Sequence, residues 1–69
     1  MAMTTTSVVS SMIDSIGYDP DIKTLEVTMV SGDTYDYYEV PQEVYDAFIN
    51  APSHGRFFDE FIKNSYSYD

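Results

Sequence analysis

The sequence of 69 residues has no cysteine, one histidine and only three lysine or arginine residues. The lack of cysteine excludes disulfides and cysteine-ligated zinc, and the single histidine excludes a site built from several histidines. No apolar run approaches the ~20 residues of a transmembrane helix. Residues 1–7 carry no lysine or arginine and no apolar segment, so we do not expect a secretion signal. We therefore expect a cytoplasmic protein without a membrane partner, metal or cofactor.

Acidic residues dominate the charge of the chain. Twelve aspartate and glutamate residues against three lysine and arginine residues give a formal net charge of -9. This charge opposes a purely electrostatic association with nucleic acid. With 43% hydrophobic residues, the chain is nevertheless too apolar for a disordered protein, and its length allows one domain.

The pattern of apolar residues predicts an α+β fold. Residues 1–7 are small and polar, which indicates a disordered N-terminal tail, and residues 8–69 form a single domain. Apolar and polar residues alternate over 10–18, 22–30 and 34–40, as in strands. After Pro41 the period changes to that of a helix, and Ser53 is a suitable N-cap for a second helix. We predict a three-stranded antiparallel β-meander followed by two short α-helices packed on one face.

The orientation of the tyrosines in the third strand depends on the hairpin before it. Ser31-Gly32-Asp33 predicts a turn in which Gly32 adopts positive φ. A loop of three residues would place Tyr35 and Tyr37 on the same face as Val27, whereas a loop of two would place them on the opposite face. The sequence leaves both registers open.

Several short motifs stand in order along the chain: Ser10-Ser11, Ile16-Gly17-Tyr18-Asp19, Leu25-x-Val27, Gly32, Tyr35-x-Tyr37, Val40-Pro41, Val44-Tyr45 and Ser53-x-Gly55-x-Phe57-Phe58. This ordered set resembles the KTSC domain family over residues 10–66. This small module occurs alone in bacterial and phage proteins and at the C-terminus of some lysyl-tRNA synthetases. The resemblance implies a binding domain without an established activity, for which RNA is a suggested ligand, and the central Tyr-x-Tyr of the family falls on Tyr35 and Tyr37.

Two groups of residues are candidates for ligand binding, each with a structural alternative. Tyr35 and Tyr37 are suitable as a stacking platform for bases, or as core residues beneath a helix. The segment Ser53-His54-Gly55-Arg56 is suitable for capturing an anion at a helix N-terminus. Alternatively, Ser53 only caps the helix and Arg56 pairs with Glu60, as Lys63 would with Asp59.

The sequence does not predict an enzyme. His54 has a neighbouring serine but no third group to orient it, and the paired acids lack the pattern of a calcium loop. We therefore expect a binding module for RNA or a nucleotide. The alternative is an acidic interaction module or inhibitor, phage-encoded or bacterial, that imitates nucleic acid and binds a basic surface on a partner protein. The small core and the many aromatic residues also favour a homodimer.

Overall fold

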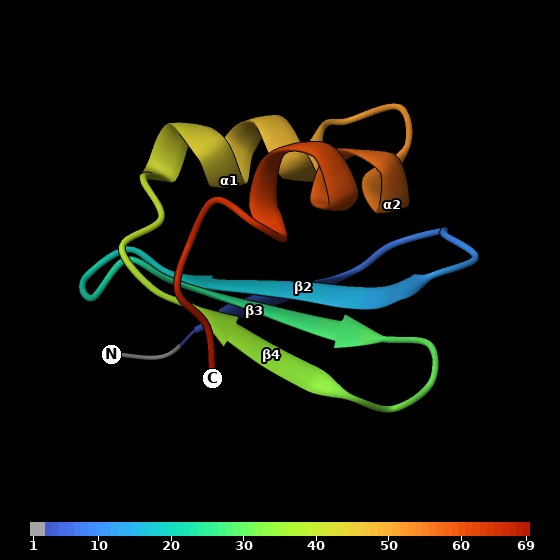
Figure 1. Cartoon of the computed structure of the whole chain (residues 1–69), viewed down its shortest axis with the longest axis horizontal. Helices are drawn as coiled ribbons and strands as arrows, with labels where there is room; N and C mark the ends of the chain where they lie inside the picture. Colours follow the sequence, from blue (N-terminus) through green and yellow to red (C-terminus); the bar gives the residue numbers. More distant parts are fainter. Residues whose placement is uncertain (1–2) are drawn as a thin grey trace.

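The fold consists of one antiparallel sheet with a layer of helices on one face. The computed structural model describes residues 3–69 (Figure 1). Three helical segments, α1 (Gln42–Ile49), α2 (His54–Phe57) and the π-helical turn η1 (Phe58–Ile62), lie over the sheet, and η1 continues directly from α2. The four strands stand in chain order: β1 (Thr4–Ser7), β2 (Ile13–Asp19), β3 (Thr24–Met29) and β4 (Thr34–Tyr37).

The prediction of three strands is wrong by one. The additional strand, β1, lies within the segment 1–7 that was expected to be a disordered tail, and residues 1–2 of that segment lie outside the described residues. β1 pairs with β2 so that Thr5 is opposite Gly17. A Cβ added at Gly17 would lie 2.8 Å from the sulfur of Met3, so this glycine allows the start of the chain to pack closely. The strand contains only threonine and serine, and therefore has no apolar alternation to reveal it.

The hairpin between β3 and β4 adopts the register with a three-residue loop. The amide of Met29 donates to the carbonyl of Asp33 (2.8 Å), and Gly32 between them has φ +103. Val27 is then opposite Tyr35, and Leu25 is opposite Tyr37. Because opposite residues of an antiparallel pair share a face, both tyrosines point toward the helices.

The helices bury the apolar face of the sheet. Phe48 of α1 is fully buried, and Phe58 and Ile62 of η1 pack beside it on the side chains of the strands. The prediction of two short helices packed on one face of the sheet is thus confirmed, although Phe61 remains 54% exposed. The buried apolar core consists of Ile13, Ile16, Tyr18, Leu25, Val27, Tyr37, Val40, Phe48, Phe58 and Ile62.

Residues 67–69 cover the free edge of β4. Asp36 and Asp69 exchange two backbone hydrogen bonds (3.1 and 2.9 Å), and the amide of Tyr38 donates to the carbonyl of Ser67 (2.9 Å). The C-terminus accordingly lies beside β4 in Figure 1. The outer edge of β1 has no partner strand within residues 3–69. The homodimer stays a prediction, and pairing of two chains through their sheets would involve this edge of β1.

Candidate binding grooves

The two tyrosines of the Tyr-x-Tyr motif have different environments. The side chain of Tyr37 is 2% exposed and packs edge-on against Phe58, with ring centroids 5.7 Å apart. Tyr35 is only half-buried, and its ring meets that of Tyr68 edge-on at 5.6 Å. Tyr37 is therefore a core residue whose ring is not available for stacking on a base, whereas part of Tyr35 faces solvent.

Tyr35 and Tyr37 line a groove of ≈ 370 Å³ between the sheet and η1, which we call the aromatic groove. Its charged side chains are Lys63 and Asp59, at the helical side. Burial, followed by the proximity of Tyr68 and Tyr35, raises the pKa of Tyr37, so its hydroxyl stays protonated at neutral pH. The groove is lined by Met12, Met29, Tyr35, Tyr37, Phe58, Asp59, Lys63, Asn64 and Tyr68.

The four residues Ser53, His54, Gly55 and Arg56 line a different groove, next to the loop before β2. The Ser53 hydroxyl accepts from the amide of Arg56 (3.3 Å), which confirms the predicted N-cap. The guanidinium of Arg56 donates to Glu60 (3.0 Å), as the pairing alternative predicted. Both alternatives to an anion site are thus present, whereas the Arg56 side chain remains 81% exposed and the anion site itself stays a prediction.

His54 and Gly55 also make internal contacts. The Nε2 atom of His54 lies 3.1 Å from the carbonyl oxygen of Ile49, and the ring lies beside Phe48. Gly55 is buried against Met12, whose Cβ would lie 3.5 Å from a Cβ added at the glycine. Both residues thus join the start of α2 to the rest of the fold.

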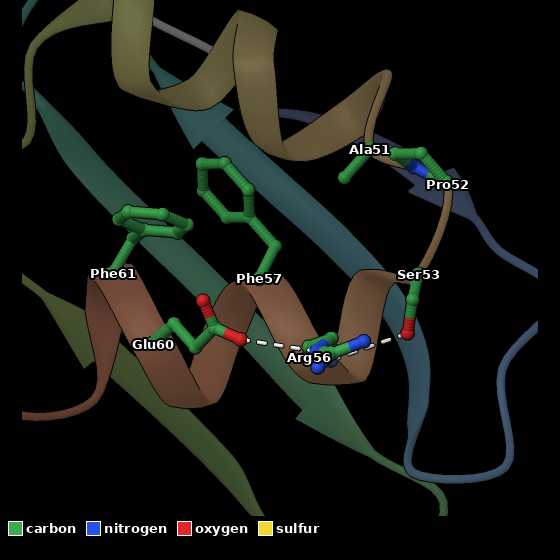
Figure 2. Close-up of a pocket in the computed structure, with 7 residues that line it drawn as sticks. All are labelled: Ala51, Pro52, Ser53, Arg56, Phe57, Glu60 and Phe61. Atoms are coloured by element: carbon green, nitrogen blue, oxygen red, sulfur yellow. Dashed lines mark hydrogen bonds and ion pairs between the residues drawn. The ribbon is translucent and has the colours of Figure 1, made fainter.

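A third groove, of ≈ 400 Å³, lies between α1 and the segment formed by α2 and η1 (Figure 2). The rings of Phe57 and Phe61 stand side by side in it, with centroids 4.8 Å apart, and the ion pair of Arg56 and Glu60 lies along the same helix. This groove is mostly apolar, and no charged group in it is free of a partner in the structure.

Sequence reasoning missed Lys63 and Tyr68 as groove residues. Lys63 was expected to pair with Asp59, but the structure of residues 3–69 contains no ion pair between them. Tyr68 contacts Tyr35 and Tyr37 because residues 67–69 pair with β4. The alternation of Tyr66 and Tyr68 was the available signal for a short strand at this position.

Two kinds of feature, a cluster of metal ligands and a membrane-spanning helix, were sought in the part of the chain that the structure describes. Within residues 3–69, no three histidine, cysteine or acidic side chains are grouped so as to hold a metal ion. Over the same range, no helix has the length and apolar character needed to cross a membrane.

Comparison with known proteins identifies the family of this small α+β domain. Residues 9–66 match the sequence profile of the KTSC domain, and the chain belongs to this family. A crystal structure of a KTSC domain protein from Yersinia pestis is 44% identical, covers 99% of this chain and 96% of its own, and superposes with a TM-score of 0.95.

The sequence relatives include both long and short proteins. A lysine–tRNA ligase from Nostoc sp. is 39% identical over 86% of this chain, but the chain spans only 10% of that enzyme. A protein of Tsukamurella paurometabola is 46% identical over 78% of this chain and 81% of its own length. The domain therefore occurs both as a small protein and as a minor part of a large one.

Proposed function

We propose that the chain is a non-enzymatic binding module that holds a nucleotide base, free or unpaired within a short RNA, in the aromatic groove. The observation that carries the proposal is the presence, in one groove, of a half-buried tyrosine ring, Tyr35, and an ammonium group, Lys63, that has no ion-pair partner within residues 3–69. The ring face is suitable for stacking on a base, and the ammonium group for a phosphate.

The other polar group of the groove supports a base as the ligand. The carboxylate of Asp59 lines the same groove and can accept N–H groups from the edge of a base. A ligand with a planar body, N–H donors and one anionic group would use all three side chains. The relatives also support the proposal, since the same domain is part of lysine–tRNA ligases, whose substrate is an RNA.

The charge of the protein limits the length of RNA that we expect to bind. The net charge is -9, and the groove contains one cation beside one anion. A long strand or a duplex would bring many phosphates close to carboxylates without compensating contacts. We therefore expect mononucleotides and short single strands to bind, and duplex RNA not to bind.

The test is a titration of the protein with nucleoside monophosphates and with single-stranded RNA pentamers, followed by NMR chemical shifts and calorimetry. Replacing Tyr35 by leucine removes the stacking face and should weaken binding by about 1–3 kcal/mol. The Lys63→Gln variant should weaken the binding of monophosphates about five- to tenfold, but leave nucleosides without phosphate unaffected.

The Arg56→Gln variant is the matched control. Like Lys63→Gln it removes one positive charge, but Arg56 does not line the aromatic groove. It should bind like the native protein. Equal losses in the Arg56 and Lys63 variants would show unspecific electrostatic attraction, and no binding by the native protein would refute the proposal.

A further inference from the structure

The groove between α1 and the segment of α2 and η1, which we call the phenylalanine groove, contains an exposed aromatic side chain. Phe61 is 54% exposed, and the centroid of its ring lies 4.8 Å from that of Phe57. The ring of Phe57 in turn stacks on the fully buried Phe48, with centroids 5.4 Å apart. The three rings thus form a continuous row from the core to the surface. Burial of the outermost ring in an interface would be favourable, because it removes apolar area from water.

The other end of the phenylalanine groove is lined by short side chains. Ala51, Pro52 and Ser53, which follow α1, form this end, whereas the rings of Phe57 and Phe61 lie at the opposite end (Figure 2). The whole groove measures ≈ 400 Å³. The end at Ala51 and Pro52 therefore has room for an apolar side chain that comes from outside the domain.

The charges that line this groove are complementary to themselves. The side chains of Arg56 and Glu60 are 81% and 52% exposed, and they pair with each other at i and i+4 (3.0 Å). In an interface with two-fold symmetry, each residue meets its counterpart in reversed order. A second copy that runs antiparallel would therefore place its Glu60 opposite Arg56 and its Arg56 opposite Glu60. A parallel copy would instead bring like charges together.

The antiparallel orientation also brings the exposed ring to the open end of the groove. When the two-fold axis passes at the level of Phe58, residue 56 of each copy is opposite residue 60 of the other. Residue 61 of each copy is then opposite residue 55. Position 55 lies between Ser53 and Arg56, which line the groove together with Ala51 and Pro52. A single arrangement therefore satisfies both the charges and the apolar groove.

We propose that the phenylalanine groove docks a second copy of this chain about a two-fold axis, with Phe61 of each copy beside Ala51 and Pro52 of the other. Charge complementarity favours this occupant. The phosphate of a nucleotide would meet Glu60, and a segment with charges of one sign would meet a like charge at either Arg56 or Glu60. The contact is small, and the net charge of -9 on each copy opposes it, so the dimer forms weakly.

Sedimentation of the full chain from micromolar to millimolar protein measures this association. The native chain should dimerise within this range, and Phe61→Ser should weaken the dimer about tenfold or more. Circular dichroism checks that the variant stays folded, as expected for a side chain that is half-exposed. Ile22→Ser is the matched control, because Ile22 is 65% exposed but lies in the turn between β2 and β3. A native chain that stays monomeric, or equal losses in the two variants, would overturn the proposal.

Exchange of charges provides a second arm that tests the antiparallel arrangement. Arg56→Glu makes both positions acidic, and Glu60→Arg makes both positions basic. An exposed ion pair contributes little to folding, so both variants should stay folded. Each variant alone should be monomeric where the native chain dimerises, because like charges then face each other. An equimolar mixture should form a heterodimer, which native mass spectrometry identifies. A mixture that stays monomeric while the native chain dimerises would refute the arrangement.

Other occupants of the phenylalanine groove are detected with the same protein. Titration with nucleoside monophosphates would shift the NMR signals of Phe57 and Phe61 if the groove held a nucleotide. A dimer that tolerates Phe61→Ser would indicate pairing through the edge of β1. Either result would overturn the proposal. Within residues 3–69, this groove shares no lining residue with the aromatic groove, so failure of nucleotide binding there leaves the test unaffected.

Discussion

At the residue scale, Tyr18 connects the sheet to the segment that enters α1. Its side chain is 2% exposed, its ring stacks on Tyr45 with centroids 4.7 Å apart, and its hydroxyl donates to the carbonyl of Val40. Replacing Tyr18 by phenylalanine keeps the ring but leaves this carbonyl without its partner. We expect a loss of about 1–2 kcal/mol in the free energy of unfolding.

Urea denaturation checks this expectation, with Tyr45→Phe as the control. Tyr45 is partly buried in the same stack, and its hydroxyl makes no hydrogen bond within residues 3–69. The control should change the free energy of unfolding by less than about 0.5 kcal/mol. Equal losses in the two variants would contradict the role assigned to the Tyr18 hydroxyl.

The same tyrosines predict how stability responds to alkaline pH. Burial raises the pKa of Tyr18 and of Tyr37 above the ordinary value of 10.0. The folded state therefore holds these protons more tightly than the unfolded state. Their contribution is complete below pH 10 and is lost as the pH rises through the folded-state values. The free energy of unfolding should fall above pH 10, with a shallower slope in Tyr18→Phe; an unchanged slope would refute the assignment.

The sequence determined the roles of the two motif tyrosines only in part. Alternation predicted that Tyr35 and Tyr37 share a face, and the structure confirms it. Which face they share depended on the length of the preceding loop, and the residues around Gly32 permit either length. The difference in burial between the two tyrosines depends on Phe58 and Tyr68, which are distant in sequence.

At the element scale, the β3–β4 hairpin depends on one glycine. Gly32 has φ +103, a region that side chains with a Cβ rarely adopt, although no atom would obstruct the methyl group. Gly32→Ala should therefore lower the free energy of unfolding by about 1 kcal/mol through backbone strain alone. Thermal denaturation followed by circular dichroism measures the change.

Gly55→Ala is the matched control for Gly32→Ala. The nearest atom to an added Cβ at Gly55 is 3.5 Å away, an ordinary contact, and the residue is helical. Alanine also favours a helix over glycine, so this variant should be as stable as the native protein or more so. A larger loss at Gly55 than at Gly32 would contradict the argument.

Elements with local signals were predicted well. The first helix begins directly after Pro41, and Ser53 caps α2, both as expected. β1 lacked a local signal because its pairing depends on Gly17 and on the packing of Met3. The π-helical geometry of η1 likewise had no counterpart in the apolar pattern, which predicted an ordinary helix.

At the scale of the whole molecule, composition predicted the charge but not its distribution. The densest acidic stretch in the sequence surrounds Asp33, Asp36 and Glu39, yet alternation separates Asp36 from the other two. In the structure Asp36 instead lies beside Glu26 and Asp69, which come from different elements. The aromatic groove, too, combines strands, η1 and the C-terminal segment, so neither group of residues could be assembled without the tertiary structure.

This distribution leads to a prediction about salt. The net charge is -9, and the carboxylates lie closer together in the folded domain than in the unfolded chain. Their mutual repulsion therefore destabilises the folded state. Sodium chloride should therefore raise the melting temperature by several degrees. For a domain of this size, such a rise corresponds to about 1 kcal/mol in the free energy of unfolding. Because the Debye length is already about 10 Å at 0.1 M, screening should be largely complete by about 0.2 M. A rise that continues linearly to molar salt would instead indicate a general salt effect on burial. The Glu26→Gln, Asp36→Asn variant should gain less from salt than the native protein, because two carboxylates that lie directly opposite each other on the sheet are already neutral.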